Sequence, residues 1–166
     1  MKRFPAFFFL GLILMISSCQ NEDMDELMIP PALIGLWEVN FYNDYIELDY
    51  VTSYLFNSNG TYVHSSTLRE KGGSQDLGYN FRSSGTYRVE GNKIFLNLTE
   101  HLHKPYGADK MFYQVNELDR GHVVEGHSEG SMNFELRNEG QELFLPGGLI
   151  GGAYQADQIL ARVNVN

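Results

Sequence analysis

Short runs of alternating apolar and polar residues, separated by turn-forming residues, dominate this sequence from Ala32 onward. Examples are residues 86–89, 93–98 and 132–137. Successive side chains of a β-strand point to opposite faces, so each run predicts a strand with one face toward a core and the other toward water. Helical spacing of apolar residues is almost absent from this part of the chain. We therefore expect an all-β protein.

Turn signals between the runs arrange the expected strands as consecutive hairpins. The pair Asn59-Gly60 separates two apolar runs and suits the tight turns whose central residues need positive φ angles. Other turns are expected at residues 90–92, 119–121 and 138–141. With a first strand at 35–43 and a last near 157–165, we count eight to ten strands. This order predicts an antiparallel meander that closes into a barrel.

Two polar segments interrupt the rhythm of short strands. Residues 70–78 are charged and glycine-bearing, and residues 99–110 carry two histidines and a proline. We interpret both segments as loops, the second of which could cross the barrel or lie at its mouth. After them, strands at 111–118 and 122–127 are expected on either side of the turn at 119–121.

A seven-residue motif of the form F-x-x-x-G-T-Y occurs twice, at residues 56–62 and at residues 81–87. We interpret each copy as a strand, a tight turn and the restart of a strand. One short match is not the period of a repeat protein. Repeat ancestry and a shared hairpin solution both explain the two copies.

The first 18 residues have the features of a secretory signal. A basic start is followed by an apolar stretch from Phe4 to Ile16 and by small residues before Cys19. The apolar stretch is shorter than the roughly 20 residues that cross a bilayer, so we expect no transmembrane helix there. Residues 16–19, Ile-Ser-Ser-Cys, resemble the lipobox of bacterial lipoproteins. The resemblance implies that the chain is cut before Cys19, which then carries acyl chains such as palmitate.

The cysteine count agrees with lipid attachment. Cys19 is the only cysteine in the chain, so an exported form has no partner for an internal disulfide. Lipid attachment uses this thiol, whereas an ordinary signal peptide would leave it free. One acyl chain binds membranes weakly, but the several chains of a lipoprotein hold a domain firmly. Cys19 is therefore the predicted lipidation site and the membrane its first predicted partner.

An acidic tether, residues 19–31, is expected between the lipid and a single domain at 32–166. Its run at 20–26 resembles the export signal that sends lipoproteins of Bacteroidetes-type bacteria to the outer face of the outer membrane. A solvated linker is the other interpretation, and we favour surface display. Loss of residues 1–18 removes two cations and changes the net charge from −9 to −11. Such an acidic chain is not expected to bind nucleic acid.

Three motifs in order resemble the lipocalin-like domains of bacterial lipoproteins. They are the opening Gly35-Leu36-Trp37, the first F-x-x-x-G-T-Y motif and residues 85–94. The likeness covers about residues 32–98, while the second half follows only in strand rhythm, and the paired cysteines of true lipocalins are missing. The resemblance implies a calycin-type barrel, anchored to the membrane, that binds a small apolar or amphipathic ligand without catalysis.

Aromatic side chains of the first half are the candidate ligand contacts. If the barrel is open they line a cavity, and if it is filled they form the core. For Trp37, a plug at the closed end is the leading interpretation. The five candidates are Trp37, Phe56, Tyr62, Phe81 and Tyr87.

The remaining chemistry predicts neither an enzyme nor a cofactor. His101 and His103 have a spacing that can hold a metal ion, yet nothing in the spacing supplies further ligands, so no metal site is predicted. Carboxylates of the second half are explained as solvated, and no nucleophile elbow or phosphate-binding glycine loop occurs. The other function that we consider is an accessory protein that docks onto an outer-membrane protein through the outward-facing Phe95 and Phe144.

Overall fold

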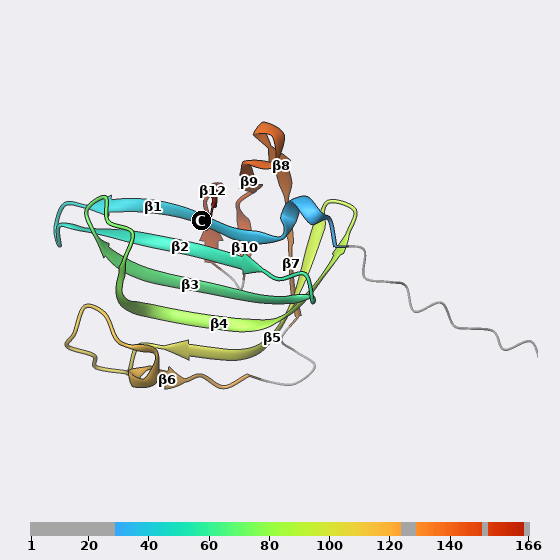
Figure 1. Cartoon of the computed structure of the whole chain (residues 1–166). Coiled ribbons are helices and arrows are strands. Elements are labelled where there is room, and N and C mark those ends of the chain that lie inside the picture. The colour runs from blue at the N-terminus through green and yellow to red at the C-terminus, as the bar shows by residue number, and fades with distance from the viewer. Residues whose placement is uncertain (1–28, 124–128, 151–152, 165–166) are drawn as a thin grey trace, which may run out of the picture.

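Ten antiparallel strands form one sheet in the computed structural model, which describes residues 29–123, 129–150 and 153–164 (Figure 1). The helices of the described part are three short 3-10 turns, η1 (Pro31–Leu33), η2 (Val115–Glu117) and η3 (Asn138–Gly140). The strands of the main sheet are β1 (Gly35–Asn43), β2 (Leu48–Phe56), β3 (Thr61–Glu70), β4 (Asp76–Glu90), β5 (Lys93–His103), β6 (Asp119–Arg120), β7 (Glu129–Asn133), β8 (Glu135–Arg137), β9 (Glu142–Leu145) and β12 (Gln158–Val163). A separate hairpin pairs β10 (Gly148–Ile150) with β11 (Ala153–Gln155). The predicted all-β class is confirmed.

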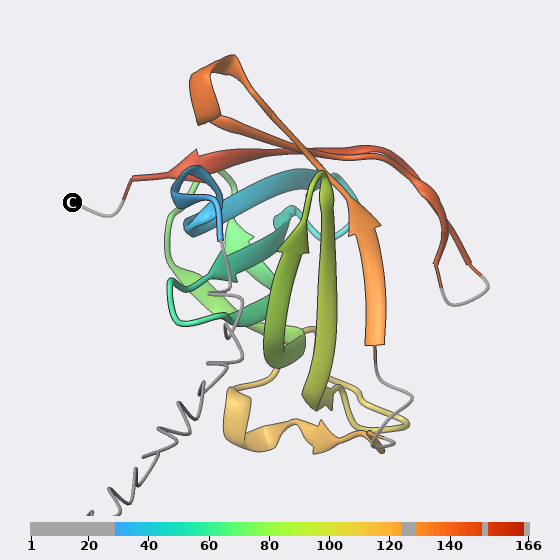
Figure 2. The same cartoon turned by 90° about the vertical axis from the view of Figure 1, so that its right-hand side faces the viewer.

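The sheet is an antiparallel meander with an open strand path. Its order is β6-β5-β4-β3-β2-β1-β12-β9-β8, and β7 also pairs with β5. The sheet curls, so that β9 and β12 lie across one end of it (Figure 2). β7 pairs with β5 and β8 pairs with β9, but the pairing is interrupted at Phe134, between β7 and β8. The sheet is therefore not closed into a barrel. The predicted antiparallel meander is thus confirmed, but its closure into a barrel is not.

Several expected elements lie where the sequence predicted them. The first strand spans 35–43, and the turns at 90–92 and 138–141 separate β4 from β5 and β8 from β9. The final strand, β12, lies within the expected 157–165. The first predicted loop is shorter than expected, because β3 and β4 leave only residues 71–75 between them. The second begins later and ends later than expected, since β5 continues to His103 and the next strand, β6, begins at Asp119.

The prediction of a hairpin around residues 119–121 was wrong for its first strand. Residues 111–118 do not form a strand, because Gln114 and Glu117 cap the short η2 turn within them. The turn residues Asp119 and Arg120 instead pair with the end of β5, opposite His103 and Leu102. Residues 124–128 of the second expected strand lie outside the described residues.

The two copies of the F-x-x-x-G-T-Y motif adopt different structures. The first forms the expected hairpin between β2 and β3, with Gly60 at a φ of +77°. The second lies inside the continuous strand β4, which corrects the expected turn there. The two G-T-Y triplets pair with one another: Thr61 faces Thr86, Tyr62 faces Gly85, and the Tyr87 amide donates to the Gly60 carbonyl at 2.7 Å. β4 stays continuous at Gly85 because the register of its pairing with β5 shifts between Ser84 and Gly85.

The core fills the space between β1–β5 and the returning strands β9 and β12. Its buried side chains are Leu33, Trp37, Tyr54, Phe56, Tyr62, Tyr87, Ile94, Phe134, Leu143, Leu145 and Leu160. The indole of Trp37 is fully buried and donates a hydrogen bond to the Leu33 carbonyl at 2.8 Å. Burial of these side chains stabilises the curled sheet, at roughly 1.5–3 kcal/mol for each large apolar side chain. Among the described residues, no helix has the length and apolar character to cross a membrane.

Candidate functional site

The core-facing side of β1–β5 continues well beyond the core. Residues directly opposite one another on antiparallel strands share a face. One such row runs from Trp37 on β1 across the sheet to His101 on β5; between these two lie Tyr54, His64 and Ser83. The next row contains Thr52, Ser66, Phe81 and His103. Three histidines therefore lie on the same face as the buried tryptophan.

Exposure divides this inner face into two halves. The apolar half contains Trp37, Phe56, Tyr62 and Tyr87, all of which are buried. We call the other half the histidine half. Its side chains Thr52, His64, Ser66, Phe81, His101 and His103 are partly exposed, while Ser83 among them is 8% exposed. The same division runs along β1, where Trp37 is 0% exposed and Phe41, four residues on and on the same face, is 69% exposed. The core cluster therefore covers one end of the inner face, while beyond the histidine half Leu68, on the same face of β3 as Ser66, is also buried.

Four of the five candidate ligand contacts lie together in the apolar half. Trp37, Phe56, Tyr62 and Tyr87 belong to one buried cluster, so they form the core there. The Tyr87 hydroxyl donates to the carbonyl of Asn57 at 2.9 Å. Phe81 is the exception, because it lies in the histidine half between His64 and His101. Sequence reasoning grouped these five aromatics, and the sheet separates Phe81 from the others.

Aromatic and imidazole rings follow one another across the histidine half. The His64 ring stacks on Tyr54 with 4.0 Å between ring centroids and meets the edge of Phe81 at 4.9 Å. His101 lies 6.3 Å from Phe81, and His103 lies 5.7 Å from His101. The row is therefore continuous over four strands, and its rings offer both apolar faces and polar nitrogen atoms.

The two central imidazoles are neutral at neutral pH. Removal from water between Tyr54 and Phe81 lowers the pKa of His64 to about 4, and the neighbouring charge of His101 acts in the same direction. Burial, and then the charge of His103, also lower the pKa of His101. A neutral imidazole carries one donor and one acceptor nitrogen. His64 and His101 therefore present an uncharged surface with hydrogen-bonding capacity.

Two hydrogen bonds orient the histidines at the end of the row. The hydroxyl of Ser83 and Nδ1 of His101 are 2.8 Å apart, and Nδ1 of His103 donates to the Lys104 carbonyl at 2.7 Å. The spacing of His101 and His103 in the sequence indicated that pair. It gave no sign of His64 and Ser83, which come from other strands. Within the described ranges, no group of three or more His, Cys, Asp or Glu side chains is arranged to hold a metal ion.

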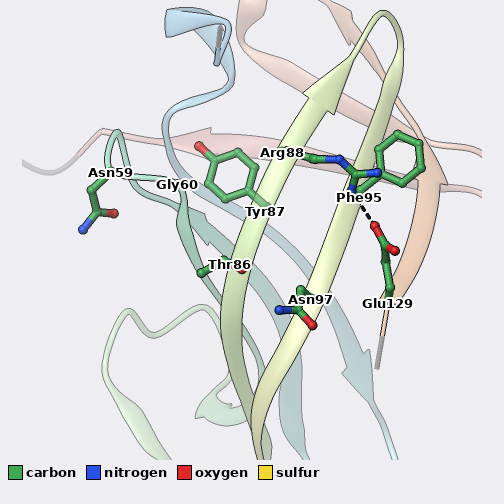
Figure 3. Close-up of a pocket in the computed structure, with 8 residues that line it drawn as sticks. All are labelled: Asn59, Gly60, Thr86, Tyr87, Arg88, Phe95, Asn97 and Glu129. Carbon is green, nitrogen blue, oxygen red and sulfur yellow. Dashed lines mark hydrogen bonds and ion pairs between the residues drawn. The ribbon is translucent and has the colours of Figure 1, made fainter. Parts of the chain in front are cut away.

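A hollow lies on the outer side of the sheet. It has a volume of about 550 Å³ and lies over β4, β5 and β7 next to the β2–β3 turn (Figure 3). We call it the outer groove; its lining residues are Asn59, Gly60, Thr86, Tyr87, Arg88, Phe95, Asn97 and Glu129. The guanidinium of Arg88 lies 3.9 Å from the centroid of the Phe95 ring and pairs with Glu129 and Glu90. In the sequence, the residues of this groove were recognisable only as the polar, outward-facing positions of the alternating strands.

Comparisons with known proteins identify no relative of this chain. No protein-family model, no curated protein and no solved structure matches it. The resemblance to lipocalin-like lipoproteins is therefore supported only by the motifs of this sequence.

Proposed function

We propose that this chain is a lipid-anchored, non-enzymatic binding module that holds a small apolar or amphipathic ligand on the histidine half of its inner face. The observation that carries the proposal is the change of exposure along β1, from 0% at Trp37 to 69% at Phe41. A face that is a dry core at one end and partly open at the other can accept a ligand without unfolding. The buried end supplies the stability that the open end lacks.

The chemistry of the histidine half suits an amphipathic ligand. Phe81 and the stacked rings of Tyr54 and His64 offer apolar contact. Hydroxyls of Thr52 and Ser66 and the neutral imidazoles can hydrogen-bond to a polar group of the ligand. Binding pockets commonly combine a largely apolar lining with a few polar groups that set the ligand's orientation. Beside the neutral imidazoles of His64 and His101, a fully ionised ligand would lose hydration without gaining a charged partner.

We further propose that the sheet acts as a lipocalin-like barrel whose seam lies at Phe134. The segment β7–Phe134–β8 is continuous in the chain and pairs with β5 on one side and with β9 on the other. Side chains from both sides of this seam, including Ile94 and Leu143, belong to one core cluster. One segment shared between two edges would enclose the inner face, as a barrel does.

The proposed location is the outer membrane, with the domain displayed at the cell surface on acyl chains at Cys19. This part of the proposal is supported by the signal-like residues 1–18, the lipobox-like tetrapeptide and the acidic tether. The described residues begin at Ile29, so nine residues, 20–28, separate Cys19 from them. As an extended chain these reach at most about 35 Å, enough to hold the domain clear of the lipid.

Ligand capture can be tested on the full-length chain purified from its host. Native mass spectrometry should find a retained small molecule, and the protein should take up a fluorescent probe such as 1-aminoanthracene. Ser66→Trp places an indole opposite Phe81 on the inner face, so it should abolish both signals. Ile159→Trp is the matched control, because Ile159 is 53% exposed and lies on the strand face opposite that of the buried Leu160. A wild-type protein that is empty and takes up no probe would show the proposal to be wrong.

Docking onto another envelope protein is the second candidate function. It is favoured by the exposed apolar side chains Tyr45, Tyr106 and Met111, which are 98%, 105% and 49% exposed. The two aromatics first considered for docking are each covered on one face, Phe95 by Arg88 and Phe144 by Arg137 at 3.9 and 3.6 Å from the ring centroids. Cross-linking in intact cells should give a defined partner, and replacement of Tyr45, Tyr106 and Met111 by serine should remove it.

A further inference from the structure

We propose that the outer groove is a second binding site, specific for neutral oligosaccharides. The groove lies on the outer face of β4, β5 and β7, whereas the proposed ligand site lies on the inner face. Its volume of about 550 Å³ is within the range of small-ligand sites, roughly 300–1,000 Å³. This is room for a short segment of a sugar chain.

Two adjacent rows of side chains give the groove its chemistry (Figure 3). Thr86, Asn97 and Glu129 lie opposite one another on three neighbouring strands and form a row of hydroxyl, amide and carboxylate groups. Beside it, Arg88 faces Phe95 and holds the aromatic ring in place through the contact at 3.9 Å. Sugars present apolar C–H faces together with many hydroxyls, so they need an aromatic surface next to planar polar groups.

The β2–β3 turn supplies the opposite wall. The amide oxygen of Asn59 accepts hydrogen bonds from the Thr61 amide at 3.1 Å and from its hydroxyl at 2.7 Å. These contacts orient the Asn59 side chain at the border of the groove before any ligand arrives. Polar groups that are already oriented lose less conformational entropy on binding. The pairing of the two G-T-Y triplets fixes this turn against β4, so the wall is part of the sheet.

Charge selects a neutral ligand over an anionic one. The cation of the groove, Arg88, is already paired with Glu129 and Glu90, and the Lys93 ammonium lies 5.8 Å from the centroid of the Phe95 ring, so these four side chains carry no net charge. The whole chain is acidic, with a net charge of −9. An anionic polysaccharide would therefore be repelled, while hydroxyl groups can still share the ion pair through hydrogen bonds.

The chain contains a matched control for this site. On β8 and β9, Arg137 covers Phe144 at 3.6 Å and pairs with Glu135 at 2.6 Å, which repeats the arrangement of Arg88, Phe95 and Glu129. The Phe144 group contributes no residue to the lining of the outer groove. The two groups thus share their chemistry and differ in the hollow beside them.

The test is titration of the full-length chain, in a zwitterionic detergent without a sugar headgroup, with a panel of hexasaccharides. The neutral arm contains β-1,4-glucan, α-1,4-glucan, β-1,4-xylan and α-mannan fragments, and the anionic arm contains a hexauronate. Isothermal titration calorimetry should detect at least one neutral ligand. Asn97→Ala changes an exposed side chain and should weaken binding at least tenfold, as should Phe95→Ala, while Phe144→Ala should bind like the wild type.

The outcomes separate this site from the inner one. Ser66→Trp, which blocks the inner face, should leave oligosaccharide binding unchanged, so either site can fail without the other. The proposal is overturned if no neutral hexasaccharide binds, if only the hexauronate binds, or if Asn97→Ala and Phe144→Ala have the same effect.

Discussion

Tyr62 and Gly85 face each other across β3 and β4 with no room for another atom between them. A Cβ atom built at Gly85 would lie 3.0 Å from Cε1 of Tyr62 and 2.0 Å from the carbonyl oxygen of Asn97. The second contact is with backbone, which cannot rotate away as a side chain can. Gly85 is therefore required by close approach at the point where β4 and β5 change register.

Gly85→Ala should lower the free energy of unfolding by about 3 kcal/mol, because the new methyl group forces the strands apart. Urea denaturation followed by the fluorescence of Trp37, the only tryptophan, would measure the change. Gly130→Ala is the control, since a Cβ there meets nothing within 4 Å. Equal stabilities of the two variants would contradict this account of Gly85.

Acid should destabilise the protein through His64. Its pKa is about 4 in the folded protein, against 6.5 in an exposed histidine. The unfolded chain therefore binds the proton more tightly than the folded protein. The stability that neutral His64 contributes is fully present above pH 6.5 and is lost as the pH falls from 6.5 to 4. The loss should reach up to about 3 kcal/mol for this one group. Urea midpoints measured from pH 7 to pH 4.5 would follow it.

His64→Phe provides the control for this pH dependence, because a phenyl ring can keep the stack on Tyr54 but takes up no proton. The variant should lose most of the decline in stability between pH 6.5 and 4.5. A smaller decline should persist, since burial also lowers the pKa of His101. An unchanged pH profile in His64→Phe would contradict the assignment to His64.

Arg69→Met should destabilise the protein by about 2 kcal/mol. The guanidinium donates to both carboxylate oxygens of Glu38, at 2.7 and 2.8 Å, and to Asp76 at 2.6 Å, with the Arg69 side chain only 15% exposed. Its removal leaves the Glu38 carboxylate partly buried without this partner. Lys110→Met breaks the more exposed pair with Glu117 and should cost less than about 1 kcal/mol. Thermal unfolding of the two variants would rank them, and a larger effect at Lys110 would refute this reasoning.

Cys19→Ser should abolish labelling of the chain by radioactive palmitate in cells, because only the thiol can form the thioether to the lipid. The variant should also leave the membrane fraction. Glu22→Gln keeps the cysteine and serves as the control for labelling. A Cys19→Ser chain that still incorporates palmitate would refute lipid attachment at this position.

The strands were predictable where the sequence alternates and where its turns are unambiguous. The expected first strand matches β1 in full, and the β4–β5 turn lies at the expected residues 90–92. The second F-x-x-x-G-T-Y motif was misread because Gly85 is compatible with a turn and with a crowded strand. Only contact with Asn97, a residue of another strand, decides between the two.

The candidate site was predictable in part, because side-chain identity is local and its neighbours are not. Phe81 was among the five expected contacts, yet its ring partners His64 and His101 come from β3 and β5. The other four aromatics share its chemistry and lie in the core, where β9 and β12 cover them. Whether an inward-facing aromatic is core or site thus depends on how far the returning strands reach.

The single-residue junction at Phe134 has a consequence for local unfolding. The ladders beside it are short, with five residue pairs between β7 and β5 and three between β8 and β9, whereas β2 and β3 share nine. Short ladders at an edge open at lower free energy than the centre of a sheet. Backbone amides of β7 and β8 should therefore exchange with deuterium well before those of β2 and β3. The protein would then open locally between β7 and β8, and a molecule could reach the inner face there without global unfolding.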